Sequence, residues 1–215
     1  MCCAIMETPH WNFESTLHVY EPAEDSFLLL DVLESDLQCL KDKRPAVVVE
    51  IGSGSGVIIS ALAKALGKTA HCIAVDISES ACYVTQETST MNFTQVDVVR
   101  GDLSSCLRPA SVDLLVFNPP YVVTCDNEIS GTLQRAWAGG ARGRVVIDRL
   151  LDQVDKLLSP KASFYLVVIK ENIPEEIIGV LERKGFVGEQ VAFKKIRGEQ
   201  LSILRFSRCL NTLHS

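Results

Sequence analysis

Short strands rich in β-branched residues alternate with helical segments along most of the chain, and this alternation strongly limits its possible folds. One continuous apolar run, "AVVVEI" (46–51), is typical of a strand buried on both faces, and "VIISALAKAL" (57–66) has helical periodicity. Further strands are predicted at 71–77, 94–99, 112–117, 163–169, 186–193 and 200–206, and further helices at 20–40, 78–92, 143–158 and 174–184. The pattern predicts an α/β doubly wound, mostly parallel sheet. Only "KKIRGE" separates the last two strands, which predicts an antiparallel hairpin at one edge.

The length of 215 residues favours one domain with one core. We expect this domain over 19–207, a flexible N-terminus over 1–18 and a C-terminal tail over 208–215. No apolar run approaches the roughly 20 residues that span a bilayer, and the start lacks the pattern of a secretory signal. We therefore expect the protein in the cytoplasm, with the nucleus as a second location and no membrane partner.

Charge and cysteine content give no signal for a nucleic-acid binder, a zinc site or a disulfide framework. The net charge is −6, with 21 basic and 27 acidic residues, so the chain predicts no basic face for nucleic acid. The eight cysteines are scattered without CxxC or Cys/His spacing, which indicates neither a zinc site nor a disulfide framework.

The loop "EIGSGSGV" (50–57) connects the first strand to the next helix. Gly52, Gly54 and Gly56 allow the backbone to approach a ligand closely, and the following helix offers free N–H groups. Glycines also form tight turns in many folds, so the loop alone is a weak signal.

Two carboxylates at strand ends strengthen the hypothesis of a nucleoside ligand. Asp76 ends the second strand, where it can accept both hydroxyls of a ribose, and Asp102 follows the third strand at the height of the attached base. A helix cap and a surface turn are the alternatives for these residues. The carboxylate of Glu50 would repel a pyrophosphate but suits an ammonium and a sulfonium, which favours S-adenosylmethionine over NAD.

The stretch "FNPPYVV" (117–123) follows the fourth strand. Two consecutive prolines make a stiff, extended turn that places an amide and a phenol at the mouth of the strand. The Asn118 oxygen and the Pro119 carbonyl can accept hydrogen bonds from a planar NH2 group, and Tyr121 can pack on its plane. Without a nearby histidine as base, catalysis would rest on orientation.

These motifs resemble the HemK family of protein-glutamine methyltransferases, and its eukaryotic branch in particular. The resemblance covers about residues 19–180 through "VYEPAEDSFLLLDVLE", "EIGSGSG", "VDI", "DLLVFNPPYVVT", "AWAGGARGR" and "FYLVVIKENIPEEI". It implies a class I S-adenosylmethionine-dependent methyltransferase fold, with a seven-stranded sheet in the order 3-2-1-4-5-7-6.

The resemblance also implies the roles of the site residues. It assigns Glu50, Gly52 and Gly54 to the methionine part of the cofactor, Asp76 to its ribose, Asp102 and Leu103 to its adenine, Ser26 to capping the site, and Asn118, with Pro119 and Tyr121, to the substrate amide. After transfer the cofactor would leave as S-adenosylhomocysteine. The segment "LQRAWAGGARGR" (133–144) is interpreted either as a substrate-facing loop or as a segment that buries Trp137.

The implied substrate is the glutamine of the Gly-Gly-Gln loop in the eukaryotic class-1 translation release factor. Histone lysine and DNA adenine N6 are alternative acceptors, a non-catalytic stabilising subunit is an alternative from another class, and a NAD oxidoreductase ranks last. The implied partner is a small zinc-binding activator subunit. We expect a heterodimer through strand 94–99, which would lie at a sheet edge with unpaired backbone groups.

Overall fold

The computed structural model describes residues 6–15, 19–124, 139–196 and 198–208. The described helices are α1 (Glu24–Ser35), α2 (Leu37–Lys43), α3 (Val57–Leu66), α4 (Glu79–Met91), α5 (Val145–Leu157) and α6 (Pro174–Glu182), with short 3-10 turns η2 (Gly67–Thr69), η5 (Ala141–Gly143) and η6 (Lys170–Asn172). The strands are β1 (Val47–Ile51), β2 (His71–Asp76), β3 (Val96–Arg100), β4 (Val112–Phe117), β5 (Leu158–Ile169), β6 (Phe186–Ile196) and β7 (Glu199–Arg208).

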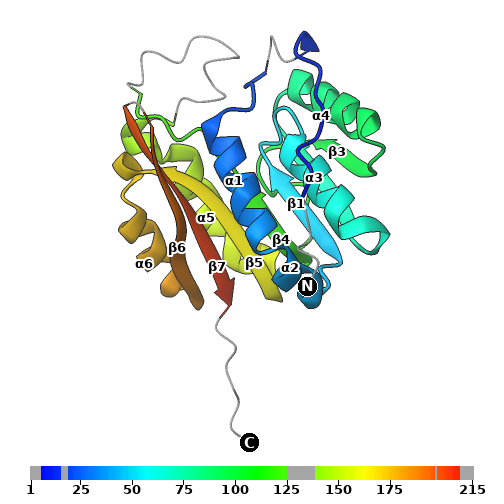
Figure 1. Ribbon diagram of the computed structural model, residues 1–215. Coiled ribbons are helices and arrows are strands. Elements are labelled where there is room, and N and C mark those ends of the chain that lie inside the picture. Colours follow the sequence, from blue (N-terminus) through cyan, green and yellow to red (C-terminus); the bar gives the residue numbers. More distant parts are fainter. Residues whose placement is uncertain (1–5, 16–18, 125–138, 197, 209–215) are drawn as a thin grey trace, which may run out of the picture.

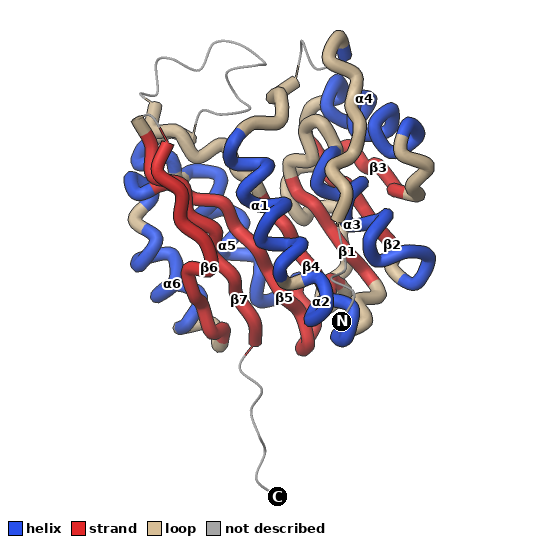
Figure 2. The backbone as a smooth tube through the Cα atoms, in the orientation of Figure 1, coloured by secondary structure: helices blue, strands red, loops and turns tan. Residues whose placement is uncertain are grey.

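Within the described residues, seven strands form one sheet in the order β3-β2-β1-β4-β5-β7-β6. The strands β1 to β5 pair in parallel, whereas β7 is antiparallel to both β5 and β6. This confirms the predicted fold class, strand order and edge hairpin. Helices α1 to α4 cover one face and α5 and α6 the other (Figures 1 and 2). All parallel strands therefore end at the same edge, where a ligand site is expected.

The central strands are buried on both faces, which explains their continuous apolar runs. Every residue of β4 is buried, and the fully buried Leu29 and Leu33 of α1 belong to the same core cluster as Phe164 of β5 and Phe206 of β7. None of the helices described here is both long and apolar enough to cross a membrane.

The prediction of one helix over 20–40 is wrong. The chain forms α1 and α2, which meet at Asp36. The carboxylate of Asp36 accepts hydrogen bonds from Tyr165 of β5 and Arg205 of β7, at 2.7 and 2.6 Å, so the junction is tied to the sheet. Pro22 is buried ahead of the helix and does not lie in its first turn.

Two strand boundaries also differ from the prediction. β3 spans 96–100 and not 94–99, because Thr94 still hydrogen-bonds through its N–H and its hydroxyl to the Ser89 carbonyl at the end of α4. β5 begins at Leu158, ahead of the predicted 163, and its pairing with β4 shifts register between Val112 and Leu114. Such an irregularity accommodates an extra length of strand that sequence periodicity does not reveal.

Part of the N-terminal segment contacts the domain. The Met6 N–H donates to Glu34, Glu7 pairs with Lys64, and Asn92 exchanges two hydrogen bonds with the backbone of His10. The domain limits and the flexibility expected for 1–18 stay predictions. The C-terminal tail was predicted over 208–215. Residues 209–215 lie outside the described residues, and β7 continues to Arg208.

Candidate active site

The glycine loop lies against the turn that follows β4. Gly52 and Gly54 have φ of 66° and 51°, values that favour glycine, and the Gly52 N–H donates to the Val75 carbonyl at 2.7 Å. A methyl group at Gly52 would lie 3.6 Å from the Phe117 ring and 3.8 Å from the Asn118 carbonyl oxygen. The loop predicted for the cofactor and the turn predicted for the substrate are therefore neighbours.

The third glycine of the loop has a packing role. A methyl group at Gly56 would lie 2.7 Å from the Cα of Thr85 in α4, so only glycine allows α3 to start this close to α4. The Thr85 hydroxyl also hydrogen-bonds to Ser53 and to the Gly54 carbonyl. Through Thr85, helix α4 thereby holds the glycine loop in place.

Glu50 is a buried carboxylate at the base of this loop. Its Oε2 accepts a 2.9 Å hydrogen bond from the Ile59 N–H in the first turn of α3. Burial raises the pKa of Glu50 well above its ordinary value, and the Asp76 charge raises it further, against the lowering effect of the Ile59 hydrogen bond. Among the described residues, no positively charged group contributes to this shift. A ligand that brings a positive charge would therefore stabilise the Glu50 carboxylate.

The two strand-end aspartates differ in their surroundings. Asp76 is held at the end of β2 by the N–H groups of Gly54 and Ser78, at 3.0 and 2.8 Å, and burial raises its pKa. Asp102 is exposed and pairs with Arg149 of α5 at 2.6 Å, next to the buried Leu103. The structure brings Asp76 to the glycine loop, whereas the Asp102 side chain is engaged with α5.

Asn118 has one satisfied end and one free end. Its Nδ2 donates to the Asp25 carboxylate at 3.0 Å. Its Oδ1 is buried, and nothing in the described chain hydrogen-bonds to it. Because an unpaired buried acceptor costs about 1–3 kcal/mol, this oxygen is ready to accept a hydrogen bond from a ligand.

Asp25 is a residue of the candidate site that the sequence analysis did not select. It is 2% exposed, and its Oδ2 also accepts from the Tyr121 hydroxyl at 3.0 Å, while its Oδ1 accepts from the Ser26 N–H at 2.7 Å. The sequence signal was the acidic pair in "YEPAED", which suits a helix N-terminus equally well. Tyr121 is buried and directed at this carboxylate, so its phenol is not free at the mouth of the strand.

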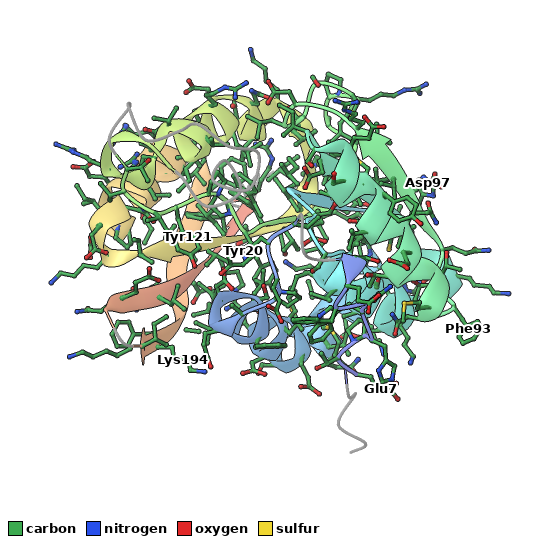
Figure 3. The ribbon with its side chains drawn as sticks, turned by 90° about the horizontal axis from the view of Figure 1, so that it is seen from above. Glu7, Tyr20, Phe93, Asp97, Tyr121 and Lys194 are labelled. Atoms are coloured by element: carbon green, nitrogen blue, oxygen red, sulfur yellow. The ribbon has the colours of Figure 1, made fainter. Side chains whose placement is uncertain are left out.

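A pocket of about 240 Å³ opens beside these residues. It is lined by Tyr20, Asp25, Asn118, Pro119, Tyr121, Val122 and Glu199. Figure 3 shows Tyr20 and Tyr121 side by side, and burial together with the Asp25 charge raises the pKa of both tyrosines. Burial and the Asp25 charge also raise the pKa of Glu199, which enters the pocket from β7. The charged groups among these lining residues are acidic.

The turn is braced from behind by Asn172 of η6, which is fully buried. Its Nδ2 donates to the carbonyls of Tyr121 and Arg142, both at 2.9 Å, and its Oδ1 accepts from the Ile169 N–H at 2.8 Å. A methyl group at Gly143 would lie 1.8 Å from the Tyr121 carbonyl oxygen. The described end of "LQRAWAGGARGR" therefore supports the turn, whereas Trp137 and residues 125–138 lie outside the described residues.

A sheet of this order, with its ligand site at the carboxyl ends of β1, β2 and β4, is the architecture of class I S-adenosylmethionine-dependent methyltransferases, and this chain is one of them. Residues 26–192 match the family model of the methyltransferase small domain. The chain is 45% identical to the human protein "Methyltransferase HEMK2" over 194 residues, which cover 88% of this chain and 90% of the human one. It therefore belongs to the eukaryotic branch of the HemK-like release factor glutamine methyltransferases.

Two further relatives agree with this assignment. The "eRF1 methyltransferase catalytic subunit mtq2" of Schizosaccharomyces pombe is 36% identical over 211 residues, which cover 91% of each chain. The solved structure of the E. cuniculi Mtq2–Trm112 complex, described as responsible for methylation of the eRF1 translation termination factor, superposes with a TM-score of 0.71 at 30% identity. The match covers 90% of this chain and all of that chain.

Proposed function

We propose that this chain transfers a methyl group from S-adenosylmethionine to the side-chain nitrogen of the glutamine in the Gly-Gly-Gln loop of the class-1 translation release factor. The relatives named for eRF1 methylation support this substrate. Action on a release factor would take place in the cytoplasm.

The residues present fit the cofactor. Glu50, Gly52 and Gly54 would hold its methionine part, Asp76 its ribose, and Asp102 and Leu103 its adenine. The buried Glu50 carboxylate suits the cofactor's ammonium, and the backbone at Gly52 leaves room next to Asn118. When bound, the cofactor supplies a methyl group on a sulfonium sulfur.

The unpaired Oδ1 of Asn118 is the observation that carries the proposal. An amide nitrogen is a weak nucleophile, because its lone pair is delocalised into the carbonyl. Asn118 Oδ1 and the Pro119 carbonyl would accept the two N–H bonds of the substrate amide and hold its nitrogen in line with the methyl group. As the N–C bond formed and the sulfur–methyl bond broke, with its electron pair staying on sulfur, these acceptors would stabilise the positive charge that grows on nitrogen, and the amide proton would then leave to solvent.

The pocket also weighs against a nucleic-acid substrate. A base flipped from DNA would bring its phosphates to a pocket whose charged lining residues are Asp25 and Glu199. A purely structural subunit would have no use for an unpaired acceptor beside the glycine loop. A glutamine side chain, which is neutral and presents an NH2 group, matches this pocket best.

The first prediction tests the acceptor directly. Asn118→Ala should lower kcat by about 10²–10³, because the acceptor acts on the substrate, and should leave cofactor affinity nearly unchanged. Label transfer from radiolabelled cofactor should be compared for four substrates: release factor, a release factor whose Gly-Gly-Gln glutamine is replaced by asparagine, histone and DNA. Cofactor binding should be measured separately by calorimetry. Faster labelling of histone or DNA, or collapse of cofactor binding in the mutant, would refute the assignment.

We also propose that a small zinc-binding subunit pairs with β3, since the E. cuniculi relative is described in complex with Trm112. β3 lies at a sheet edge, where Val98 and Val99 are half-buried. Next to it, Ile77 and Tyr83 of the β2–α4 region are 66% and 69% exposed. A strand with one open edge beside exposed apolar side chains favours addition of a strand from a partner.

A further inference from the structure

The Asn118 side chain has two ends of similar shape and opposite hydrogen-bonding roles. The oxygen can only accept and the NH2 group can only donate. Whichever end faces the pocket therefore determines whether the turn can bind a substrate NH2 group or would reject it. Nothing in the motif "NPPY" itself fixes this orientation.

The structure assigns this choice to Asp25. Its carboxylate lies 3.0 Å from Asn118 Nδ2, and a carboxylate only accepts hydrogen bonds. If the Asn118 amide were flipped, its oxygen would lie about where Nδ2 lies now, 3.0 Å from the Asp25 carboxylate oxygen. These two acceptors would repel each other, and water would screen them little because Asp25 is buried. The amide is therefore held with Oδ1 as the free end, as observed.

The carboxylate itself is fixed by other donors. The Tyr121 hydroxyl donates to the same Oδ2 as Asn118, and the Ser26 N–H and hydroxyl both donate to Oδ1, at 2.7 and 3.3 Å. Asp25 is 2% exposed, so water competes little for these bonds. The carboxylate therefore has a single position from which to orient Asn118.

We propose that Asp25 is a positioning residue that acts through Asn118. It sets the acceptor end toward the substrate, and its charge polarises the Asn118 amide so that Oδ1 becomes a stronger acceptor. This inference rests on the proposed function for its kinetic consequence but not for its structural one. It also explains why an acidic residue stands at this position of α1, which is 93 residues away from Asn118 in the sequence.

The kinetic test is a double-mutant cycle on the full chain with release factor as substrate. Asp25→Ala should lower kcat roughly 10- to 100-fold, as removal of a supporting partner typically does, with little change in cofactor affinity. The double variant Asp25→Ala, Asn118→Ala should be no slower than Asn118→Ala alone, because Asp25 acts through the missing amide. Asp31→Ala removes an exposed aspartate of the same helix and should behave as wild type. Unchanged kcat in Asp25→Ala, or multiplicative losses in the double variant, would overturn the proposal.

A second arm does not depend on the substrate. The side-chain NH2 resonances of Asn118 can be assigned by their absence in Asn118→Ala and followed in Asp25→Asn, which keeps the shape of the aspartate and is the milder variant for folding. Loss of the carboxylate should shift these resonances and speed rotation of the amide. Unchanged resonances in a folded Asp25→Asn would refute the orientation, whereas shifted resonances with no release factor methylation by wild type would refute only the proposed function.

Discussion

Two buried carboxylates of the site have opposite surroundings. Asp25 accepts hydrogen bonds from the Ser26 N–H and from the side chains of Asn118 and Tyr121. Among the described residues, Glu50 accepts one hydrogen bond, from the Ile59 N–H, and burial is the largest influence on its pKa. Asp25 is therefore a satisfied structural acceptor, whereas Glu50 carries a cost in the free protein that a bound cation could offset.

This difference gives a prediction for Glu50→Gln. The raised pKa of Glu50 means that its neutral form favours folding below the ordinary value of 4.5, and that this advantage is lost as pH rises through the folded-state pKa. Glutamine keeps an acceptor for Ile59 without the charge. Above that pKa the mutant should therefore unfold at a higher temperature, with each kcal/mol gained worth roughly 2–4 °C.

Glu50→Gln should also lower the affinity for the cofactor about 10- to 100-fold, since one charge-assisted hydrogen bond is lost. Thermal unfolding from pH 4 to 8 and calorimetric titration measure both effects. A mutant that is less stable than wild type at pH 8, or that binds the cofactor equally well, would contradict this account of Glu50.

At the scale of elements, the turn after β4 owes its shape to segments that come later in the chain. The Gly139 N–H donates to the Val122 carbonyl at 2.7 Å, and Asn172 donates to the Tyr121 carbonyl. Arg144 is buried and bonds to Asp148 of α5 and Glu176 of α6, at 2.7 and 2.9 Å. Gly139 and Asn172 thus hold the turn after β4, on the proposed substrate side of the site, in place.

Gly143→Ala tests this brace. The added methyl would lie 1.8 Å from the Tyr121 carbonyl oxygen, and φ of 65° is unfavourable for alanine. We expect a loss of roughly 3 kcal/mol or more in the free energy of unfolding, from strain and overpacking together. Gly185→Ala is the matched control, because φ is 85° and, apart from its chain neighbours, no atom of the described residues lies within 4 Å of the added methyl.

The control should lose only about 1–2 kcal/mol, the cost of the backbone conformation alone. Chemical denaturation of both variants gives the difference. Equal losses would mean that the segment can move away from the turn, and the brace would then be disproved.

At the scale of the whole molecule, the sheet has two edges with different exposed side chains. β3 and the neighbouring α4 form one side, where Figure 3 shows Asp97 and Phe93. β6 forms the other edge and exposes Phe193. The first side presents the exposed Ile77 and Tyr83 beside its edge strand, and the proposed partner is expected there.

Val98→Lys should abolish co-purification with the proposed small zinc-binding subunit, because a charge would enter the apolar part of the proposed added-strand interface. Phe193→Lys places the same charge on the opposite edge and should leave the complex intact. Pull-down from co-expressing cells, with circular dichroism to verify folding, compares the two variants. Loss of the complex only in Phe193→Lys would move the interface to β6.

The order of the elements, and the placement of Glu50, Asp76 and Asn118 at one edge of the sheet, were determined by the sequence. Hydrophobic periodicity and turn chemistry are local properties, and they predicted β1, α3 and β4 nearly to the residue. Because parallel strands end at one edge, they also predicted that Glu50, Asp76 and Asn118 would share a site.

The orientation of the groups within the site was decided only by the tertiary structure. Asp25 meets Tyr121 across 96 residues, Asn172 meets Tyr121 across 51, and Glu199 enters the pocket from the last strand. A hydrogen bond between distant side chains leaves no period in the sequence, and its geometry depends on how helices pack on the twisted sheet. For this reason the sequence could name Asn118, but only the fold shows which of its two polar atoms is free.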